Sequence, residues 1–156
     1  MSIAAASRTL AAALMCACAL GATAQDNAQL PDKLEVIDRT VGTGAEVRVG
    51  YFVTAQYSGY VYDPGAPDHK GKRFVDSRER GEALSYVYGY KRAVPGFEKG
   101  LKGMKVGGSR TIIVPVKLGY DDLKYPRPAD IPPNSALVFE VELLDVVPQG
   151  APPDPQ

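Results

Sequence analysis

Side chains that carry covalent or metal chemistry are scarce in this sequence, which has one histidine, two cysteines and no tryptophan. Cys16 and Cys18 lie near the N-terminus, and the residues around His69 do not show the spacing of a metal site, so we interpret it as a solvated loop histidine. No glycine-rich phosphate loop follows an expected strand, and no nucleophile motif is present. An enzyme with this sequence would therefore have to work without a covalent nucleophile.

The sequence also lacks an excess of charge of either sign, because lysine plus arginine and aspartate plus glutamate each number 18. A neutral chain offers no basic field for nucleic acid and no polybasic patch for a membrane surface. With 45% hydrophobic and 23% charged residues, the composition is ordinary for a globular protein of one domain. We therefore expect no nucleic-acid partner.

Residues 1–24 have the composition of a secretory signal peptide. Arg8 precedes an apolar run at 10–20, and the small residues Ala22 and Ala24 form a cleavage site. The run is too short to span a bilayer, so we expect cleavage after Ala24 and a periplasmic or secreted protein with no membrane span. Cleavage would remove both cysteines and with them any disulfide. The alternative is a lipoprotein in which Cys18 becomes the lipid-bearing N-terminus.

The rest of the chain divides into one domain and two tails. Residues 25–33 are polar and residues 148–156 are proline-rich, so both segments are predicted to be flexible. The folded domain is expected at 34–147, and no internal repeat is found.

Within this domain, β-branched and aromatic residues dominate the extended segments. Strands or short extended pieces are expected at 33–38, 45–49, 51–62, 72–76, 83–88, 109–115 and 136–145. Alternation along the second long segment places Val53, Ala55 and Tyr57 on one inward face. Five to six strands with one helix entering late predict an α+β domain in which an antiparallel sheet covers a helix.

The single expected helix begins at Pro95, whose fixed φ suits a first helical turn. Phe97, Leu101 and Met104 follow at spacings of four and three, so they share one apolar face. Glycines from Gly103 onward are expected to end the helix after about three turns. Such a short helix cannot bury its face alone and needs a sheet to lie on.

Aromatic and apolar residues recur where the sheet is expected to meet the helix. The pattern alone favours core positions for Phe74, Phe97 and Phe139, while buried hydroxyls of Tyr57 and Tyr120 would need a partner.

Residues 117–133 form a long, proline-rich irregular loop of the kind that is usually functional. Its adjacent acids, Asp121 and Asp122, are interpreted as solvated side chains rather than paired catalytic carboxylates or calcium ligands.

Motifs that occur together in one known family run through the domain in order. They are residues 56–59, Phe74 with 76–77 and 80–81, residues 94–104, the turn at 131–134, and residues 137–144. Together they resemble the macrolide-binding (FKBP-type) peptidyl-prolyl isomerases over about 34–147. The resemblance implies the family fold, a half-open antiparallel sheet wrapped around one short helix, and catalysis of rotation about X–Pro bonds without a cofactor or metal.

Carried over residue by residue, the resemblance also implies a pocket. Phe97 would form its floor, and Tyr57, Phe74 and Phe139 its walls. Tyr120 would be a hydroxyl donor at the rim. Further pocket positions are Leu84, Ala93, Val94 and Ile131, of which Val94 would offer its backbone N–H to a substrate carbonyl.

The sequence departs from the family pattern beside the wall phenylalanine. The acidic residue expected directly after Phe74 is Val75, and Asp76 follows one place later. We count Asp76 among the expected catalytic residues, although strand alternation turns it toward another face than the usual acid. In addition, Leu84 replaces a usual aromatic residue, the loop before Phe74 is longer, and Asp121 replaces a glycine. The presence of Val75 in place of the acid is expected to weaken macrolide binding more than it weakens isomerase activity.

The expected substrates are proline-containing unfolded or folding polypeptides, with macrolide inhibitors as ligands of the same pocket. The chain has no N-terminal helical dimerisation arm, so we expect a monomer. The alternative function is a non-catalytic chaperone or peptide-binding module that uses the same groove.

Overall fold

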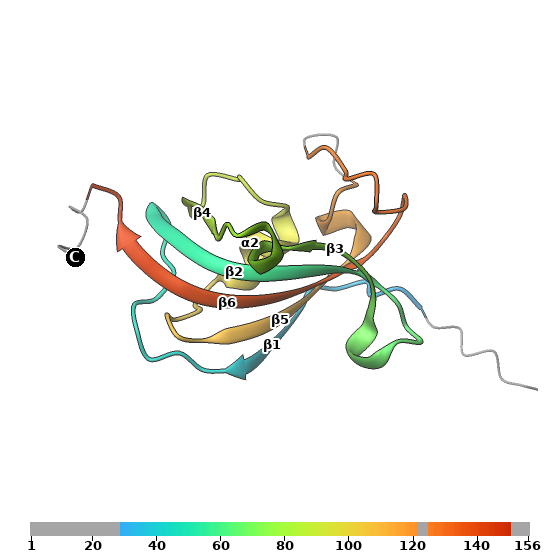
Figure 1. Ribbon diagram of the computed structural model, residues 1–156, viewed down its shortest axis with the longest axis horizontal. Coiled ribbons are helices and arrows are strands. Elements are labelled where there is room, and N and C mark those ends of the chain that lie inside the picture. Colours follow the sequence, from blue (N-terminus) through green and yellow to red (C-terminus); the bar gives the residue numbers. More distant parts are fainter. Residues whose placement is uncertain (1–28, 122–124, 151–156) are drawn as a thin grey trace, which may run out of the picture.

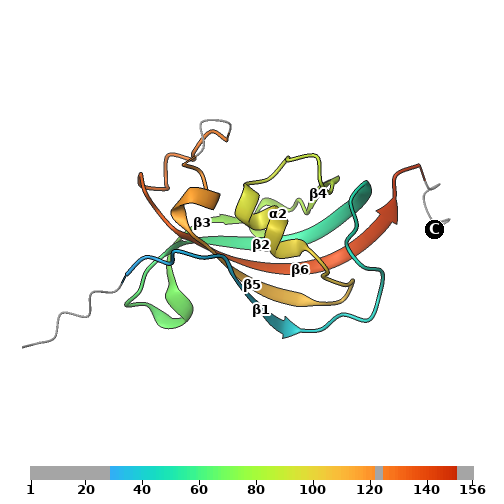
Figure 2. The same cartoon turned by 180° about the vertical axis from the view of Figure 1, so that it is seen from behind.

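The computed structural model describes residues 29–121 and 125–150, in which an antiparallel sheet of six strands curves around one short helix, α2 (Figures 1 and 2). The elements are β1 (Glu35–Thr40), β2 (Tyr51–Tyr62), β3 (Lys70–Asp76), α1 (Ser77–Arg80), β4 (Leu84–Val87), α2 (Pro95–Leu101), β5 (Ser109–Val114) and β6 (Leu137–Pro148), with 3₁₀ turns at Pro67–His69 and Val116–Leu118. This architecture confirms the predicted α+β fold. The predicted signal peptide, Cys18 and Asp122 lie outside the described residues.

Two long central strands organise the sheet, whose order is β1-β5-β6-β2-β3. β2 and β6 pair antiparallel from Tyr51 opposite Pro148 to Val61 opposite Leu137. The other edge of β2 pairs with β4 over its first half, as far as Ala55, and with β3 over its second half. Strand pairing on that edge is therefore interrupted at 56–57, next to the point where α1 packs.

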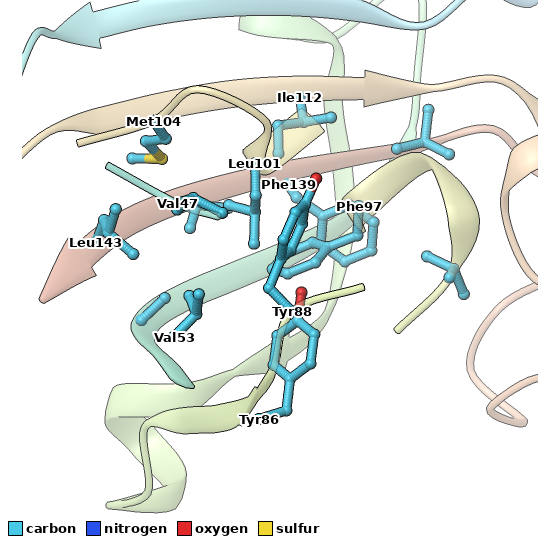
Figure 3. Close-up of a cluster of buried hydrophobic side chains, with 14 of the residues drawn as sticks. Val47, Val53, Tyr86, Tyr88, Phe97, Leu101, Met104, Ile112, Phe139 and Leu143 are labelled. Carbon is cyan, nitrogen blue, oxygen red and sulfur yellow. The ribbon is translucent and has the colours of Figure 1, made fainter. Parts of the chain in front are cut away.

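The core lies between α2 and the concave face of the sheet (Figure 3). Phe97 and Leu101 on the helix are 2% and 0% exposed, and they pack against buried residues of the sheet such as Ile112. Gly100 allows this close approach, because a Cβ atom there would lie 2.5 Å from Cδ1 of Ile112. Since Phe97 is fixed on this helix, the seating of α2 on β5 also sets the position of the predicted pocket floor.

Helix α2 ends at Leu101 and is shorter than the sequence predicted. Gly103 has a φ of +71°, a left-handed conformation that favours glycine and ends the helix. Met104 therefore lies beyond the helix, although it is still buried in the core. Arg110 completes this end, because its Nη1 donates to the carbonyl oxygens of Gly100 (2.7 Å) and Lys102 (3.0 Å).

Between the expected extended segments at 72–76 and 83–88, the structure contains a one-turn helix, α1, that was not predicted from the sequence. Asp76 is its N-cap, since its Oδ1 accepts from the backbone N–H groups of Arg78 (2.9 Å) and Glu79 (3.3 Å). Gly81 closes the helix with a φ of +69°. Ser77 is buried and its hydroxyl accepts from the backbone N–H of Tyr57 (2.8 Å), which fills part of the interruption on the edge of β2.

β6 runs to Pro148, beyond the expected end at 145 and into the first residue of the segment that was expected to be flexible. The remaining differences concern the edges of the sheet. The expected extended piece at 45–49 makes only an isolated bridge, between Glu46 and Lys105. All residues of β1 are exposed, including Val36 and Ile37, because this edge strand pairs only with β5. Across the part of the chain that the structure describes, no helix is long and apolar enough to cross a membrane.

Candidate active site

A cavity of about 270 Å³ opens above the N-terminal end of α2. Its lining residues are Tyr57, Leu84, Arg92, Ala93, Val94, Phe97, Tyr120, Tyr125, Pro126 and Phe139. They come from β2, β4, β6, α2 and the two irregular segments before α2 and after β5. Segments far apart in the sequence thus converge on one cavity, and half of its lining residues are aromatic.

Phe97 lies at the bottom of this cavity, in the first turn of α2. Its ring is in edge contact with Phe139 at a centroid distance of 5.1 Å and with Tyr57 at 5.7 Å. The interplanar angles of 81° and 69° are those of edge-to-face pairs, which aromatic quadrupoles favour. Phe97 is only 2% exposed, so these contacts hold it in one orientation.

Phe74 supports the cavity without lining it. Its ring packs edge-on against Phe139 and Tyr120, at distances between ring centroids of 5.9 Å and 6.4 Å. Gly59 makes this arrangement possible, because a Cβ atom there would lie 2.6 Å from Cζ of Phe74 and 3.0 Å from Cε1 of Phe139. Gly59 was part of the sequence motif, but its support of both rings could not be read from the pattern.

Two hydrogen-bond donors belong to residues that line the cavity, Tyr120 and Val94. Tyr120 is half-buried, and its hydroxyl donates to none of the residues at 29–121 and 125–150. Burial raises the pKa of this hydroxyl, the nearby Tyr57 raises it further, and Arg80 opposes the change. Tyr120 therefore stays protonated at neutral pH, as a donor must be. Val94 is the N-cap of α2, and its backbone N–H is likewise without an acceptor in these ranges.

Asp76 and Ile131 do not line the cavity. The Oδ2 atom of Asp76 accepts from the Ser58 hydroxyl (2.9 Å) and pairs with Arg73 (3.1 Å), while Oδ1 caps α1. The Ser58 hydrogen bond and the backbone N–H groups hold the pKa of Asp76 below its usual range. Ile131 is 2% exposed and belongs to the core. The structure thus places a charged cap and a core residue where the sequence predicted pocket residues.

Arg92, Tyr125 and Pro126 line the cavity but were missed by sequence reasoning. All three lie in irregular segments, where no periodicity indicates which way a side chain points. Tyr125 joins these two segments, because its hydroxyl donates to the carbonyl oxygen of Lys91 (3.1 Å).

A larger cavity of about 400 Å³ lies next to the aromatic one, but its lining is partly charged and lacks the converging rings. We therefore assign the candidate active site to the aromatic cavity. The described residues contain no group of three or more histidine, cysteine, aspartate or glutamate side chains placed to hold a metal ion. The chemistry available is an apolar, aromatic surface with hydrogen-bond donors at its rim.

Residues 44–144 match the sequence model of the FKBP-type peptidyl-prolyl cis-trans isomerases. The chain belongs to this family. Among its relatives, it is 39% identical over 107 residues to the FKBP-type peptidyl-prolyl cis-trans isomerase FkpA of Escherichia coli, covering 69% of this chain and 35% of FkpA. It is 36% identical over 118 residues to FK506-binding protein 3 of Yarrowia lipolytica, covering 76% of this chain and 26% of that protein.

Two solved FKBP structures share this fold. The crystal structure of FkpA from Escherichia coli has a TM-score of 0.61 at 37% identity, covering 74% of this chain and 48% of that one. The crystal structure of AtFKBP13 has a TM-score of 0.60 at 28% identity, covering 76% and 96%. The chain spans only about a quarter to a third of the two relatives named above, at 26% and 35% of their lengths.

Proposed function

We propose that this FKBP-family chain is a peptidyl-prolyl cis-trans isomerase that accelerates rotation about X–Pro bonds without forming a covalent bond. The observation that carries the proposal is the aromatic cavity over Phe97, with donors from Tyr120 and the Val94 backbone at its rim. No nucleophile or titrating acid–base pair is needed, in agreement with the side chains that the cavity presents.

The mechanism follows from the physics of the amide bond. Resonance keeps a peptide bond planar, with a rotation barrier of ~18–20 kcal/mol, and X–Pro bonds interconvert in roughly tens to hundreds of seconds. Resonance also places negative charge on the carbonyl oxygen, so water stabilises the planar amide more than the twisted one. A dry aromatic cavity removes that preference and selects the twisted amide.

The residues divide these tasks. The proline ring sits on Phe97 between Tyr57 and Phe139, with Phe74 supporting the wall. The Tyr120 hydroxyl and the Val94 N–H hold the carbonyl groups that flank the rotating bond. Further contacts to the neighbouring substrate residues come from Leu84 and Ala93, while Ile131 and Asp76 stabilise the surroundings.

A protease-coupled assay on a short X–Pro peptide tests this proposal. Wild-type protein should accelerate isomerisation, and Phe97→Leu and Tyr57→Leu should lower kcat/KM, because each removes a ring that contacts the proline. The matched control is Tyr60→Leu, which makes the same change on β2 at a residue outside the cavity lining, whose hydroxyl donates to Glu140. The proposal would be wrong if the wild type did not accelerate isomerisation or if Phe97→Leu kept full activity.

The alternative is a binding module or chaperone that holds extended segments in the same cavity without speeding isomerisation. Refolding of a proline-limited protein, measured alongside suppression of its aggregation, separates the two functions. The enzyme accelerates refolding in a way that Phe97→Leu abolishes, whereas the chaperone suppresses aggregation and leaves the slow refolding phase unchanged.

We further propose that residues 1–24 are a cleaved signal peptide and that the exported protein is a monomer. The proposed isomerase domain is 34–147, with a flexible segment at 25–33 before it and a proline-rich end at 148–156 after it. Support comes from the sequence composition alone. The mass of the protein after expression with export distinguishes cleavage after Ala24 from lipid attachment at Cys18, and light scattering gives the oligomeric state. We also propose that macrolides inhibit this domain weakly, because Val75 stands in place of an acid.

A further inference from the structure

The second cavity, of about 400 Å³, has a size typical of sites that bind small ligands or side chains. Its lining includes Tyr88, Lys91, Pro95, Glu98, Lys99 and Tyr125. It therefore combines an apolar wall with charged side chains, unlike the aromatic cavity. The mechanism proposed above makes no use of it.

The two cavities adjoin one another. Tyr125 lines both, and the two linings contain consecutive residues at 91–92, 94–95 and 97–98. The hydrogen bond from Tyr125 to the Lys91 carbonyl fixes their common wall. Each extended residue advances roughly 3.3–3.6 Å. A polypeptide whose proline fills the aromatic cavity can therefore reach the second cavity within a few residues.

The lining of the second cavity includes two lysine side chains and one carboxylate, so its net charge is positive. Lys91 and Lys99 are exposed, and neither forms an ion pair with any residue in the described ranges. Glu98 also lines the cavity, but its Oε1 is buried. Burial raises the pKa of Tyr86 and Tyr88, and the charge of Glu98 raises both further. The two ammonium groups are left facing solvent.

We propose that this lysine-rimmed cavity is an extended substrate subsite that binds an acidic side chain a few residues from the proline. This inference rests on the proposed isomerase function and names the substrates it prefers, which are X–Pro segments with a nearby aspartate or glutamate. A carboxylate at the mouth is attracted to Lys91 and Lys99, while the stem of its side chain packs against Tyr88 and Pro95.

The test compares a short neutral X–Pro peptide with longer peptides that carry two glutamates or two lysines, two to four residues before or after the proline. When the charged residues lie on the side of the proline that reaches the second cavity, the glutamate peptide should have a kcat/KM about three- to ten-fold higher than the lysine peptide at low salt. The reason is that the effects of two weak, exposed charge pairs add. The preference should shrink to about two-fold or less in roughly 0.5 M salt, where such pairs are screened.

The preference is measured as the kcat/KM of each long peptide divided by the kcat/KM of the short one. In the Lys91→Glu/Lys99→Glu double variant it should reverse, so that the lysine peptide becomes the better substrate. The double variant Lys102→Glu/Lys105→Glu is the matched control, because it reverses the same number of exposed charges just after α2, outside both cavity linings, and should keep the wild-type ratio. Equal rates for glutamate and lysine peptides on both sides, with the short peptide still isomerised, would overturn the subsite alone. Failure to isomerise even the short peptide would instead overturn the isomerase function.

Discussion

Tyr120 places a protonated hydroxyl in the lining of the aromatic cavity. We expect Tyr120→Phe to lower kcat/KM about five-fold, because the variant loses one neutral hydrogen bond of ~1 kcal/mol to the twisted amide. The ring and its edge contact with Phe74 are kept, so the thermal midpoint should change little. Peptide isomerisation and a thermal melt of the same preparation check this. An unchanged kcat/KM would remove Tyr120 from the mechanism.

Gly59 lies directly beneath two rings of the site. We expect Gly59→Ala to displace Phe74 and Phe139, since the added Cβ would lie within 3.0 Å of both rings. Overpacking of this kind costs roughly 1–3 kcal/mol of folding free energy, and the displaced wall should lower activity at temperatures where the variant is still folded. Urea unfolding and the peptide assay measure the two effects.

The control for this prediction is Gly65→Ala, because a Cβ atom there meets only Oδ1 of Asp63 at an ordinary 3.5 Å. That variant should retain activity. A Gly59→Ala protein with wild-type stability and activity would mean that the rings can shift without consequence.

Asp76 contributes to stability in a way that depends on pH. Its pKa is held below the ordinary value of 3.8 by the Ser58 hydroxyl and the N–H groups of α1, so the stabilisation is present above that pH and is lost as the pH falls through the lowered pKa. Asp76→Asn keeps a capping side chain but cannot titrate. We expect the urea midpoint to fall less between pH 7 and pH 3 in this variant than in the wild type. Parallel pH curves would contradict this role.

At the scale of elements, the seating of α2 on the sheet decides where Phe97 lies, and Arg110 fixes the far end of that helix. Its Nη1 binds the last carbonyl groups of α2, and its Nε pairs with Asp38 on β1 (2.6 Å). Arg110→Met should cost roughly 1–3 kcal/mol, because a carbonyl group of the buried Gly100 is left without a partner.

Asp38→Ala is the comparison, since the Asp38 side chain is 45% exposed and its ion pair should contribute no more than roughly 1 kcal/mol. Chemical denaturation of both variants measures the difference. If Asp38→Ala lowered the free energy of unfolding more than Arg110→Met does, the contribution of Arg110 to stability would come from its ion pair with Asp38 and not from its contact with the end of α2.

The bounds of the helices and strands matched the sequence prediction where the hydrophobic periodicity was strong. They differed from it where a capping residue decided where the helix begins or ends. The alternating run of β2 gave its bounds directly, whereas α2 proved shorter because Gly103 takes a left-handed conformation before Met104. Helix α1 was not predicted, since one helical turn has no periodicity. Its only sequence signal was Asp76 in the N-cap position before a polar run.

For the molecule as a whole, the sequence was sufficient for the fold class and for most of the cavity lining. The resemblance to the family motifs indicated Tyr57, Phe97 and Phe139 as pocket residues, whereas the pattern alone favoured core positions for the two phenylalanines. The structure brings the three rings together. The sequence was not sufficient for Arg92 and Tyr125, because side-chain directions in irregular segments depend on tertiary contacts such as the hydrogen bond to Lys91. For the same reason, the second cavity had no signature in the sequence.

The most direct test of the account is NMR exchange spectroscopy on a short X–Pro peptide at equilibrium, with the protein present at about one part in a hundred. A catalyst of amide rotation must speed both directions equally, so we predict faster cis-to-trans and trans-to-cis exchange with an unchanged cis fraction. Phe97→Leu should remove most of this acceleration. Exchange rates equal to those of the free peptide, or a change in cis fraction that appears only at stoichiometric protein, would contradict the account and indicate a binding protein.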